Sequence, residues 1–205
     1  MKIMITGADG RMGQKITALA EKADYFDIAA RSHHGDALPD VAADALIDFT
    51  HPAALPAHLD YCRQNKTALI LGTTGFDADG EDMIREAAAD IPIVYSANFS
   101  IGVNILAQLS EKLASVLDDS FDIEITEAHH KHKKDAPSGT ALMLGRAAAK
   151  GRNQEFSDKA VLSRAGETGP RRAGDIGFAT IRGGEIIGEH SVLYIGDHEQ
   201  IEISH

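Results

Sequence analysis

The sequence predicts an α/β protein in which a Rossmann-like, doubly wound parallel sheet precedes a second α+β domain built on an open mixed sheet. In the first half, short apolar runs alternate with helical segments, which is the βαβ pattern. A glycine-rich turn, Gly7–Gly13, follows the first of these runs. In the second half the predicted strands are longer and helices are fewer. We place the domain boundary between residues 99 and 100, giving domains 1–99 and 100–205.

Apolar and β-branched runs define the elements of the first domain. Ala68–Leu71 is apolar throughout, as expected for a parallel strand that is covered on both faces. Thr50 precedes Pro52, and this pair predicts a capped helix start. The expected strands are 3–6, 26–30, 45–49, 68–71 and 91–96, and the expected helices begin near residue 11 and span about 52–65 and 79–89.

The second domain is predicted to begin with an amphipathic helix. Its apolar stripe recurs at helical spacing after Ser100 and consists of Ile101, Ile105, Leu109, Leu113 and Leu117. Gly183 and Gly184 predict a tight hairpin turn, because both central positions of such a turn require positive φ. The expected strands are 121–127, 160–164, 176–182, 186–194 and 200–204, with one helix near 140–150 and a loop at 167–174.

The overall charge limits the classes of partner. The 205-residue chain carries a formal net charge of -11, which argues against nucleic acid or an anionic membrane surface as a partner. No apolar run is long enough to span a bilayer, and a strand beginning near residue 2 leaves no room for a leader, so we expect a cytoplasmic protein. Cys62 is the single cysteine, and we interpret it as a packing residue.

The glycine turn suggests a nucleotide cofactor. A dinucleotide pyrophosphate needs backbone N–H groups at a helix start, with glycines where side chains would block its approach. Gly7, Gly10 and Gly13 have the spacing G-x-x-G-x-x-G rather than G-x-G-x-x-G, and a tight turn alone would also explain them. Their place between the first strand and the first helix favours cofactor binding, so we expect 1–99 to be a dinucleotide-binding domain.

Three further segments bear on the cofactor. The second strand ends at Arg31 without an acidic residue, which favours NADPH over NADH, although Arg31 can equally be an ordinary surface residue. The loops Gly72–Gly75 and Ser96–Ser100 follow predicted strands, so they should open at the edge of the sheet where ligands bind. Either loop can line a nicotinamide site or be only a turn with capping hydroxyls.

A cluster of histidines and lysines follows the strand 121–127. A solvated basic loop is the default interpretation of residues 129–134, and a His-rich tract can also bind metal. We expect no metal, because no other residues offer convincing ligand spacing. The N–H groups of Gly139 and Thr140 at the next helix start would bind a carboxylate. A histidine or lysine beside them can donate the proton that a reduction requires.

Five motifs carry a resemblance to a known family: Gly7–Gly13, Gly72–Phe76, Ala97–Asn104, Glu127–Thr140 and Gly177–Arg182. In order and in sequence they resemble the bacterial 4-hydroxy-tetrahydrodipicolinate reductases, also called dihydrodipicolinate reductases. The resemblance implies reduction of a cyclic dicarboxylate by NADPH or NADH in the diaminopimelate route to lysine. It also implies an N-terminal Rossmann-like domain and a C-terminal substrate-binding and oligomerisation domain that forms a homotetramer.

The resemblance also assigns roles to individual residues. It implies that His129 is the proton donor or acceptor and that Lys133 is the second catalytic group. His130, Gly139 and Thr140 would bind the substrate carboxylates. The implied cofactor-binding residues are Gly7, Ala8, Asp9, Gly10, Arg11, Met12, Arg31, Gly72, Thr73, Thr74, Ser96, Ala97, Asn98 and Phe99.

Two departures from the family pattern and one alternative function remain. Ala30 replaces an acidic residue that often precedes the Arg31 position, which again favours NADPH. Similar proteins continue beyond the position of His205 through a further helical segment, which we expect to be absent here. A non-catalytic NADPH sensor would keep Gly7–Gly13 without needing His129 and Lys133, and turnover assays distinguish it from an enzyme.

Overall fold

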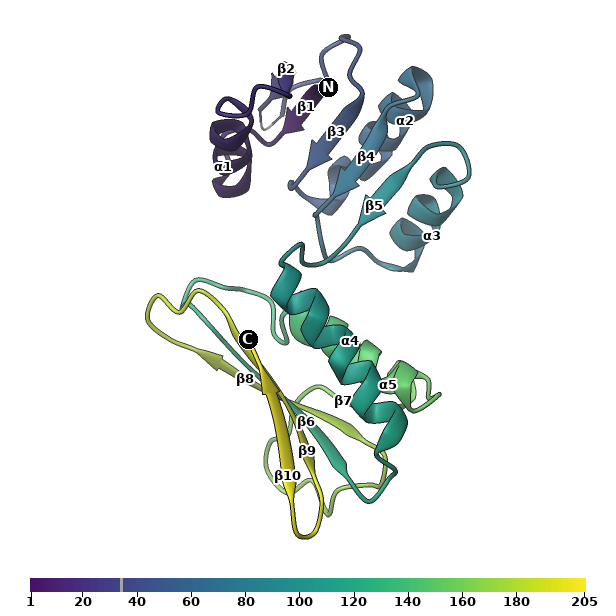
Figure 1. Ribbon diagram of the computed structural model, residues 1–205, viewed down its shortest axis with the longest axis vertical. Coiled ribbons are helices and arrows are strands. Elements are labelled where there is room, and N and C mark those ends of the chain that lie inside the picture. The colour runs from purple at the N-terminus through teal and green to yellow at the C-terminus, as the bar shows by residue number, and fades with distance from the viewer. Residues whose placement is uncertain (34) are drawn as a thin grey trace. The chain divides into compact units, whose positions relative to one another are not determined.

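The structure of the protein is a computed structural model that describes residues 1–33 and 35–205 (Figure 1). The chain divides into two compact units, Met1–Ala97 and Asn98–His205. Each unit has its own sheet and its own hydrophobic core, so each is described by itself.

The N-terminal unit contains a five-stranded sheet in the order β2-β1-β3-β4-β5, and all of its strand pairs are parallel. The chain order reverses between β1 and β3, and in open α/β sheets ligands bind beyond the carboxyl ends of the strands at such a point. The strands are β1 (Lys2–Thr6), β2 (Asp27–Ser32), β3 (Ala45–Asp48), β4 (Ala68–Leu71) and β5 (Ile93–Tyr95). The helices are α1 (Arg11–Ala20), the 3-10 turn η1 (Pro52–Ala54), α2 (Leu55–Asn65) and α3 (Ala78–Ala87).

Helices cover both faces of this sheet, so the predicted doubly wound fold is confirmed. Ile3 and Ile5 of β1 pack with Ala20 of α1 on one face. Met4, which points the other way, joins a core that includes side chains of α2 and α3. Cys62 of α2 is fully buried there, and burial together with the nearby Asp48 charge raises the pKa of its thiol to about 12. The thiol is therefore a packing group.

The start of the second helical segment differs from the prediction. Thr50 does not cap it; the side chain of His51 accepts a hydrogen bond from the Ala53 N–H at 3.2 Å and caps η1. The Thr50 hydroxyl instead donates to the Asp48 carboxylate at 2.6 Å. The prediction was wrong because Pro52 is the first residue of η1, so the capping position falls on His51, one residue after Thr50.

The C-terminal unit contains a mixed five-stranded sheet in the order β10-β9-β6-β8-β7. The β6–β8 and β7–β8 pairs are parallel, whereas β6–β9 and β9–β10 are antiparallel, as predicted for an open mixed sheet. The strands are β6 (Asp122–His129), β7 (Ala160–Val161), β8 (Ile176–Arg182), β9 (Glu189–Ile195) and β10 (Gln200–Ser204). The helices are α4 (Ile101–Val116), α5 (Gly139–Gly151) and the short α6 (Phe156–Lys159).

The long helices α4 and α5 lie side by side against this sheet (Figure 1). Leu106 of α4 and Leu144 of α5 share one core with Ile123 and Ile125 of β6. Tyr194 of β9 is fully buried in the same core, and its hydroxyl donates to the Ser110 carbonyl at 2.7 Å. The core therefore fixes β6, the central strand, between two helices on one side and its strand neighbours on either edge.

The predicted hairpin at Gly183 and Gly184 is wrong. The strands β8 and β9 lie on opposite sides of β6, so the segment between them crosses the end of that strand. Only Gly184 of the two has positive φ, at 49°. The Gly183 N–H donates to the His129 carbonyl at 3.0 Å, and Gly184 accepts from the Lys131 N–H at 3.2 Å. The glycines therefore join the end of β6 instead of closing a hairpin.

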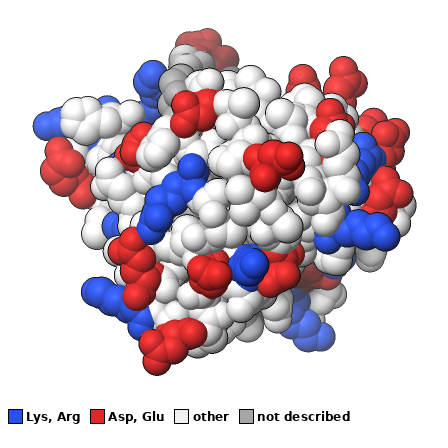
Figure 2. Space-filling model, turned by 90° about the horizontal axis from the view of Figure 1, so that it is seen from above, with Lys and Arg blue, Asp and Glu red and all other residues white. Residues whose placement is uncertain are grey.

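Several strands are shorter than predicted. In the N-terminal unit, β3 ends at Asp48 rather than at residue 49, and β5 covers Ile93–Tyr95 rather than 91–96. The predicted strand 160–164 is reduced to β7, because Arg164 turns away to bind Glu124. β9 begins at Glu189 rather than at residue 186 because the crossing segment occupies 183–188. In the described part of the chain, the helices lack the length and apolarity that crossing a bilayer demands. On the face shown in Figure 2, Lys and Arg side chains are interspersed with Asp and Glu side chains.

Candidate active site

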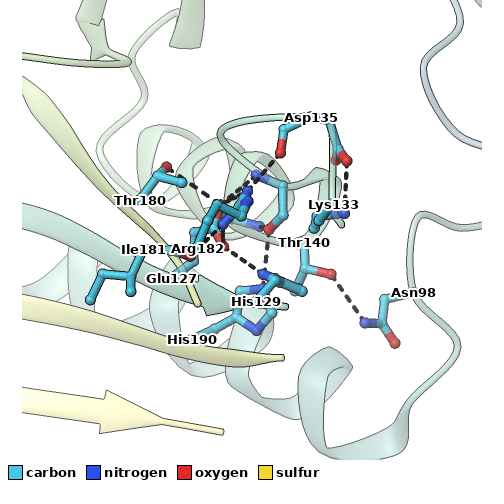
Figure 3. A network of polar contacts seen from close by, with 12 residues as sticks. Asn98, Glu127, His129, Lys133, Asp135, Thr140, Thr180, Ile181, Arg182 and His190 are labelled. Atoms are coloured by element: carbon cyan, nitrogen blue, oxygen red, sulfur yellow. Dashed lines mark hydrogen bonds and ion pairs between the residues drawn. The ribbon is translucent and has the colours of Figure 1, made fainter. Parts of the chain in front are cut away.

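Strand register gathers polar side chains on one face of the C-terminal sheet. Glu127 and His129 are two residues apart on β6, so they project from the same face. Thr180 pairs with Glu127 and Arg182 pairs with His129 on β8, while His190 pairs with Glu127 on β9. Pairing of three strands therefore builds one polar cluster from residues that are far apart in sequence (Figure 3).

Glu127 lies at the centre of this cluster and is only 2% exposed. Arg182 donates to both carboxylate oxygens, at 2.8 and 2.7 Å, and the Ser138 N–H donates to Oε1 at 3.0 Å. Nδ1 of His129 lies 2.5 Å from Oε2. Burial alone would raise the pKa of Glu127, but hydrogen bonds from Arg182, His129 and Ser138 and the Arg182 charge lower it to about 2. The group is therefore an ionised carboxylate.

The ring of His190 lies edge-on to the ring of His129, with centroids 5.0 Å apart. His190 Nε2 lies 3.1 Å from the Ser138 hydroxyl. Burial lowers the pKa of His190 to about 4, and the His129 charge acts in the same direction. His190 is therefore neutral near pH 7 and shapes the site through packing and its contact with Ser138.

The N-terminus of α5 faces this cluster. Ser138 is the N-cap, and its hydroxyl accepts from the Ala141 N–H at 3.1 Å. The N–H groups of Gly139 and Thr140 belong to the first turn, where an α-helix provides no carbonyl partner. The Thr140 hydroxyl accepts from Asn98 Nδ2 at 3.1 Å. The helix start thus offers N–H groups and the positive end of a helix dipole to an anion.

Lys133 lies in the loop between β6 and α5. Its Nζ is 2.9 Å from Oδ1 of Asp135. The Asp135 carbonyl accepts from Arg182 Nη2 at 2.6 Å, so Arg182 contacts both Glu127 and the segment that carries Lys133. Burial alone would raise the pKa of Asp135, but the Lys133 hydrogen bond and charge lower it. Lys133 is thus held by the ionised Asp135, and Figure 3 shows this pair beside Thr140 at the start of α5.

The histidine and lysine cluster separates into two parts. His129 and Lys133 join the polar network, whereas Lys131 and His132 approach the exposed Glu185 at 3.5 and 3.9 Å. The Nδ1 atom of His130 is buried and has no hydrogen-bond partner among residues 1–33 and 35–205. Within those same residues no group of three or more His, Cys, Asp or Glu side chains could hold a metal ion. The default interpretation of a solvated basic loop therefore describes Lys131, His132 and the exposed Lys134.

The glycine turn of the N-terminal unit has the shape that a pyrophosphate needs. Gly7 has a φ of 64°, and Gly10 is the N-cap of α1. A Cβ at Gly13 would lie 2.1 Å from the Gly7 carbonyl oxygen, so only glycine fits there. The Ala8 N–H donates to the Ser32 carbonyl at 3.0 Å. Asp9, Arg11 and Met12 of the predicted set are all exposed.

Two ion pairs flank this turn and were not predicted. Asp9 Oδ2 lies 2.6 Å from Nδ1 of His33, just beyond β2. Arg31 lies within β2, and its Nη2 is 2.5 Å from Oε1 of Glu21, at the end of α1. Both side chains of the second pair remain exposed, at 39% and 57%. An acidic group therefore does stand beside Arg31, although it comes from α1 and not from the second strand.

The predicted loop Gly72–Gly75 is organised by a buried aspartate that the sequence analysis missed. The Thr73 hydroxyl donates to Asp48 Oδ1 at 3.0 Å, and the Thr50 N–H donates to Thr73 Oγ1 at 2.8 Å. His58 Nδ1 lies 2.7 Å from the other oxygen of Asp48. Thr74 is exposed. An aspartate that ends an otherwise apolar strand was the available signal, since a buried carboxylate needs partners.

The predicted loop Ser96–Ser100 spans the division between the units. Ser96 and Ala97 end the N-terminal unit, and Asn98 and Phe99 begin the C-terminal unit. Asn98 Oδ1 accepts from the Ser100 N–H at 2.8 Å, while its amide nitrogen reaches Thr140. Asn98, which is predicted to bind the cofactor, thus contacts Thr140, which is predicted to bind the substrate.

The chain resembles a known protein family and several solved structures. The sequence model of the family described as "Dihydrodipicolinate reductase, N-terminus" matches residues 1–99, and that of "Dihydrodipicolinate reductase, C-terminus" matches residues 102–205. A dipicolinate-bound dihydrodipicolinate reductase from Paenisporosarcina sp. TG-14 is 22% identical, with a TM-score of 0.72, over 100% of this chain and 87% of that chain.

Two other proteins of known structure share the fold at lower identity. Aspartate dehydrogenase from Thermotoga maritima is 11% identical, with a TM-score of 0.52, over 100% of this chain and 88% of that chain. GenD2 from gentamicin A biosynthesis, in complex with NAD, is 10% identical, with a TM-score of 0.60, over 100% of this chain and 72% of that chain. An aspartate dehydrogenase and a protein in complex with NAD therefore share this fold.

Proposed function

This chain belongs to the dihydrodipicolinate reductase family, and on that premise we propose how its own residues reduce 4-hydroxy-tetrahydrodipicolinate to tetrahydrodipicolinate. Members of the family are oxidoreductases of the diaminopimelate route to lysine. The Rossmann-like unit implies a nicotinamide cofactor, which supplies a hydride when it is bound. The proposal concerns the residues that hold the two ligands and move the proton.

The cofactor site is proposed at the carboxyl edge of the N-terminal sheet. The pyrophosphate is assigned to the turn formed by Gly7, Gly10 and Gly13 at the start of α1. Gly13 packs so closely against Gly7 and Ala8 that a side chain there would collide with the turn. We assign the adenosine side to Arg31 and favour NADPH over NADH, since a guanidinium suits a phosphorylated ribose. We assign the nicotinamide side to Gly72–Thr74 and Ser96–Phe99.

The substrate site is proposed at the N-terminus of α5. The single observation that carries this assignment is the meeting of this helix start with His129 and Lys133 in one polar network. The N–H groups of Gly139 and Thr140 would bind one carboxylate, and His130 would contribute a ring nitrogen. The Paenisporosarcina enzyme is dipicolinate-bound, and dipicolinate is also a cyclic dicarboxylate.

His129 is proposed to move the proton that accompanies hydride addition. Its Nδ1 faces Glu127, so Nε2 is the ring nitrogen that can reach a substrate. The ammonium group of Lys133 would offset negative charge that develops on the substrate and is the second catalytic group. Loss of either group should lower turnover, because positioned proton donors typically contribute about 10²–10⁴-fold.

The test follows NADPH oxidation with substrate generated in situ by the preceding synthase. Lys133→Ala and His129→Gln should lower kcat about 100-fold while NADPH affinity stays unchanged. Lys131→Ala is the matched control, because this neighbouring lysine is exposed and its Nζ lies 3.5 Å from Glu185. Full turnover in Lys133→Ala would contradict its role. Absence of substrate-dependent oxidation in the wild-type protein, with NADPH binding intact, would favour the sensor alternative.

We further propose a homotetramer that acts in the cytoplasm, where NADPH is drawn upon for biosynthesis. Ile181 on β8 and Ile187 after it are 57% and 95% exposed, and the proposal is that another copy of the chain covers them. Light scattering coupled to size exclusion measures the assembly directly, and a monomer at micromolar concentration would contradict the proposal.

A further inference from the structure

The carboxylate of Glu127 contacts His129 at one specific ring atom. Oε2 lies 2.5 Å from Nδ1, and the same carboxylate accepts two hydrogen bonds from Arg182 and one from the Ser138 N–H. An ionised carboxylate can only accept hydrogen bonds, so the proton between these groups belongs to Nδ1 of His129. The neutral form of His129 therefore carries its hydrogen on Nδ1 and leaves the Nε2 lone pair open.

We propose that Glu127, clamped by Arg182, is a positioning residue that fixes the Nδ1-protonated tautomer of His129 and presents Nε2 to the substrate. The inference rests on the proposed function, in which His129 moves the proton. It assigns Glu127 and Arg182 a role that acts through His129, since neither group needs to touch the substrate.

Arg182 keeps the carboxylate in its accepting state. Its two-pronged contact fixes the plane of the carboxylate as well as compensating its charge. Burial would raise the pKa of Glu127, but the Arg182, His129 and Ser138 contacts lower it to about 2, so Glu127 does not itself take the proton from His129. The proton therefore stays on the imidazole, and Nε2 is the atom that exchanges it.

The side chains of His190 and Lys133, which lie near the His129 ring, do not compete with Glu127 for the hydrogen on Nδ1 of His129. His190 faces the ring edge-on and is neutral, with its own Nε2 directed at Ser138. Lys133 is paired with Asp135. A Cβ at Gly188 would lie 3.0 Å from Nε2, so glycine at this position keeps space open beside the reactive atom.

The experiment is a double-mutant cycle between Glu127→Gln and His129→Gln. In the wild-type background Glu127→Gln should lower kcat about tenfold or more, with NADPH affinity unchanged, by analogy with other groups that orient a catalytic histidine. In the His129→Gln background the same change should alter kcat less than about twofold, because the partner is gone. An equal loss in both backgrounds would overturn the positioning role.

The matched control is Glu124→Gln. Glu124 lies on the same strand and is also held by two arginines, Arg164 and Arg171, but it makes no contact with His129. The Glu124→Gln substitution should leave kcat within about twofold of wild type, because Glu124 lies outside the network of Glu127, His129 and Arg182. A loss in this variant equal to that in Glu127→Gln would show that any broken Glu–Arg pair on β6 lowers activity, and would overturn the proposal.

Nitrogen NMR reports the tautomer of the His129 ring directly, and a loss of stability alone would not change that tautomer. In protein labelled with 15N-histidine, long-range proton–nitrogen spectra should show the Nδ1–H tautomer for His129, whose signals are assigned by their loss in His129→Gln. Glu127→Gln should shift that ring toward the Nε2–H tautomer, and an unchanged tautomer would overturn the proposal. If Glu127→Gln does not fold, Arg182→Lys replaces it in both measurements and should give the same direction of change.

Failure of the two proposals is distinguishable. Full turnover in His129→Gln would contradict the proton-transfer role on which both rest. A strong loss in His129→Gln, combined with equal effects of Glu127→Gln in both backgrounds, would overturn the role of Glu127 alone.

Discussion

The carboxylate of Asp48 lies 2.7 Å from Nδ1 of His58 in the interior of the N-terminal unit, and neither residue is more than 6% exposed. The other oxygen of Asp48 accepts from the hydroxyls of Thr50 and Thr73. A single buried carboxylate therefore joins the end of β3, the helix α2 and the loop after β4. This loop is proposed to contact the nicotinamide, so the Asp48 cluster links stability of the unit to the shape of its ligand edge.

We predict that Asp48→Asn destabilises the N-terminal unit by about 1–3 kcal/mol, because an amide cannot accept all the hydrogen bonds that converge on this buried site. Urea denaturation gives the free energy of unfolding, and hydrogen exchange assigns the loss to peptides of β3, α2 and the Thr73 loop. Asp60→Asn is the control, since Asp60 is exposed on the same helix α2. Equal stability of the two variants would contradict this role for Asp48.

We predict that acid destabilises the C-terminal unit through Glu127. Its pKa is about 2 in the folded protein and about 4.5 in an ordinary glutamate, so the unfolded state binds the proton first. The stabilisation is therefore complete above about pH 4.5 and is lost as the pH falls toward 2. At roughly 1.4 kcal/mol per pKa unit, it amounts to about 3 kcal/mol.

The free energy of unfolding, measured in urea between pH 5.5 and 3, should therefore fall more steeply for the wild-type protein than for Glu127→Gln. The variant lacks this titrating group but retains the other carboxylates of the chain. Parallel curves for the two proteins would show that Glu127 titrates normally in the folded state.

Local patterns were sufficient to predict the fold class. The spacing of Gly7, Gly10 and Gly13 predicted the strand, turn and helix at the N-terminus, because short-range backbone geometry decides such turns. Gly183 and Gly184 led to a wrong prediction because only their local geometry was considered. They suit a hairpin turn, but β6 lies between β8 and β9 in the sheet. Strand order depends on contacts between distant segments, which local turn residues do not determine.

The candidate site was predictable only in part for a related reason. The proposed roles of His129 and Lys133 came from a contiguous motif, and they stay predictions. Glu127 and Arg182 were noted as parts of motifs without a role, and His190 was not considered. The β-sheet register brings Arg182 and His190 to Glu127 from 55 and 63 residues away along the chain. Asp48 and His58 were missed because a buried hydrogen bond between a carboxylate and a histidine leaves no periodic pattern.

Arg31→Ala should weaken NADPH binding about tenfold and leave NADH binding nearly unchanged, because a charge-assisted hydrogen bond to phosphate contributes about 1.5–3 kcal/mol. Part of that energy is offset by the existing contact of Arg31 with Glu21. Kinetics with each cofactor measure the ratio of the two kcat/KM values. The matched control is Arg63→Ala, since Arg63 is similarly exposed but lies on α2, where it is paired with Asp90. Equal losses with both cofactors would mean that Arg31 does not recognise the ribose phosphate.

Gly13→Ala should abolish NADPH binding and destabilise the N-terminal unit by about 1–3 kcal/mol, a typical cost of forcing an extra methyl group into a packed site. The added Cβ would lie 2.1 Å from the Gly7 carbonyl oxygen and 2.7 Å from Ala8 Cα, so the turn must open. Gly80→Ala is the control, because a Cβ at that helical position comes no closer than 3.1 Å to Phe76. Fluorescence titration with NADPH and thermal unfolding measure both effects. The added Cβ collides with backbone atoms of Gly7 and Ala8, so a rearrangement of side chains cannot relieve the collision. Normal NADPH affinity in Gly13→Ala would therefore show that the cofactor binds elsewhere.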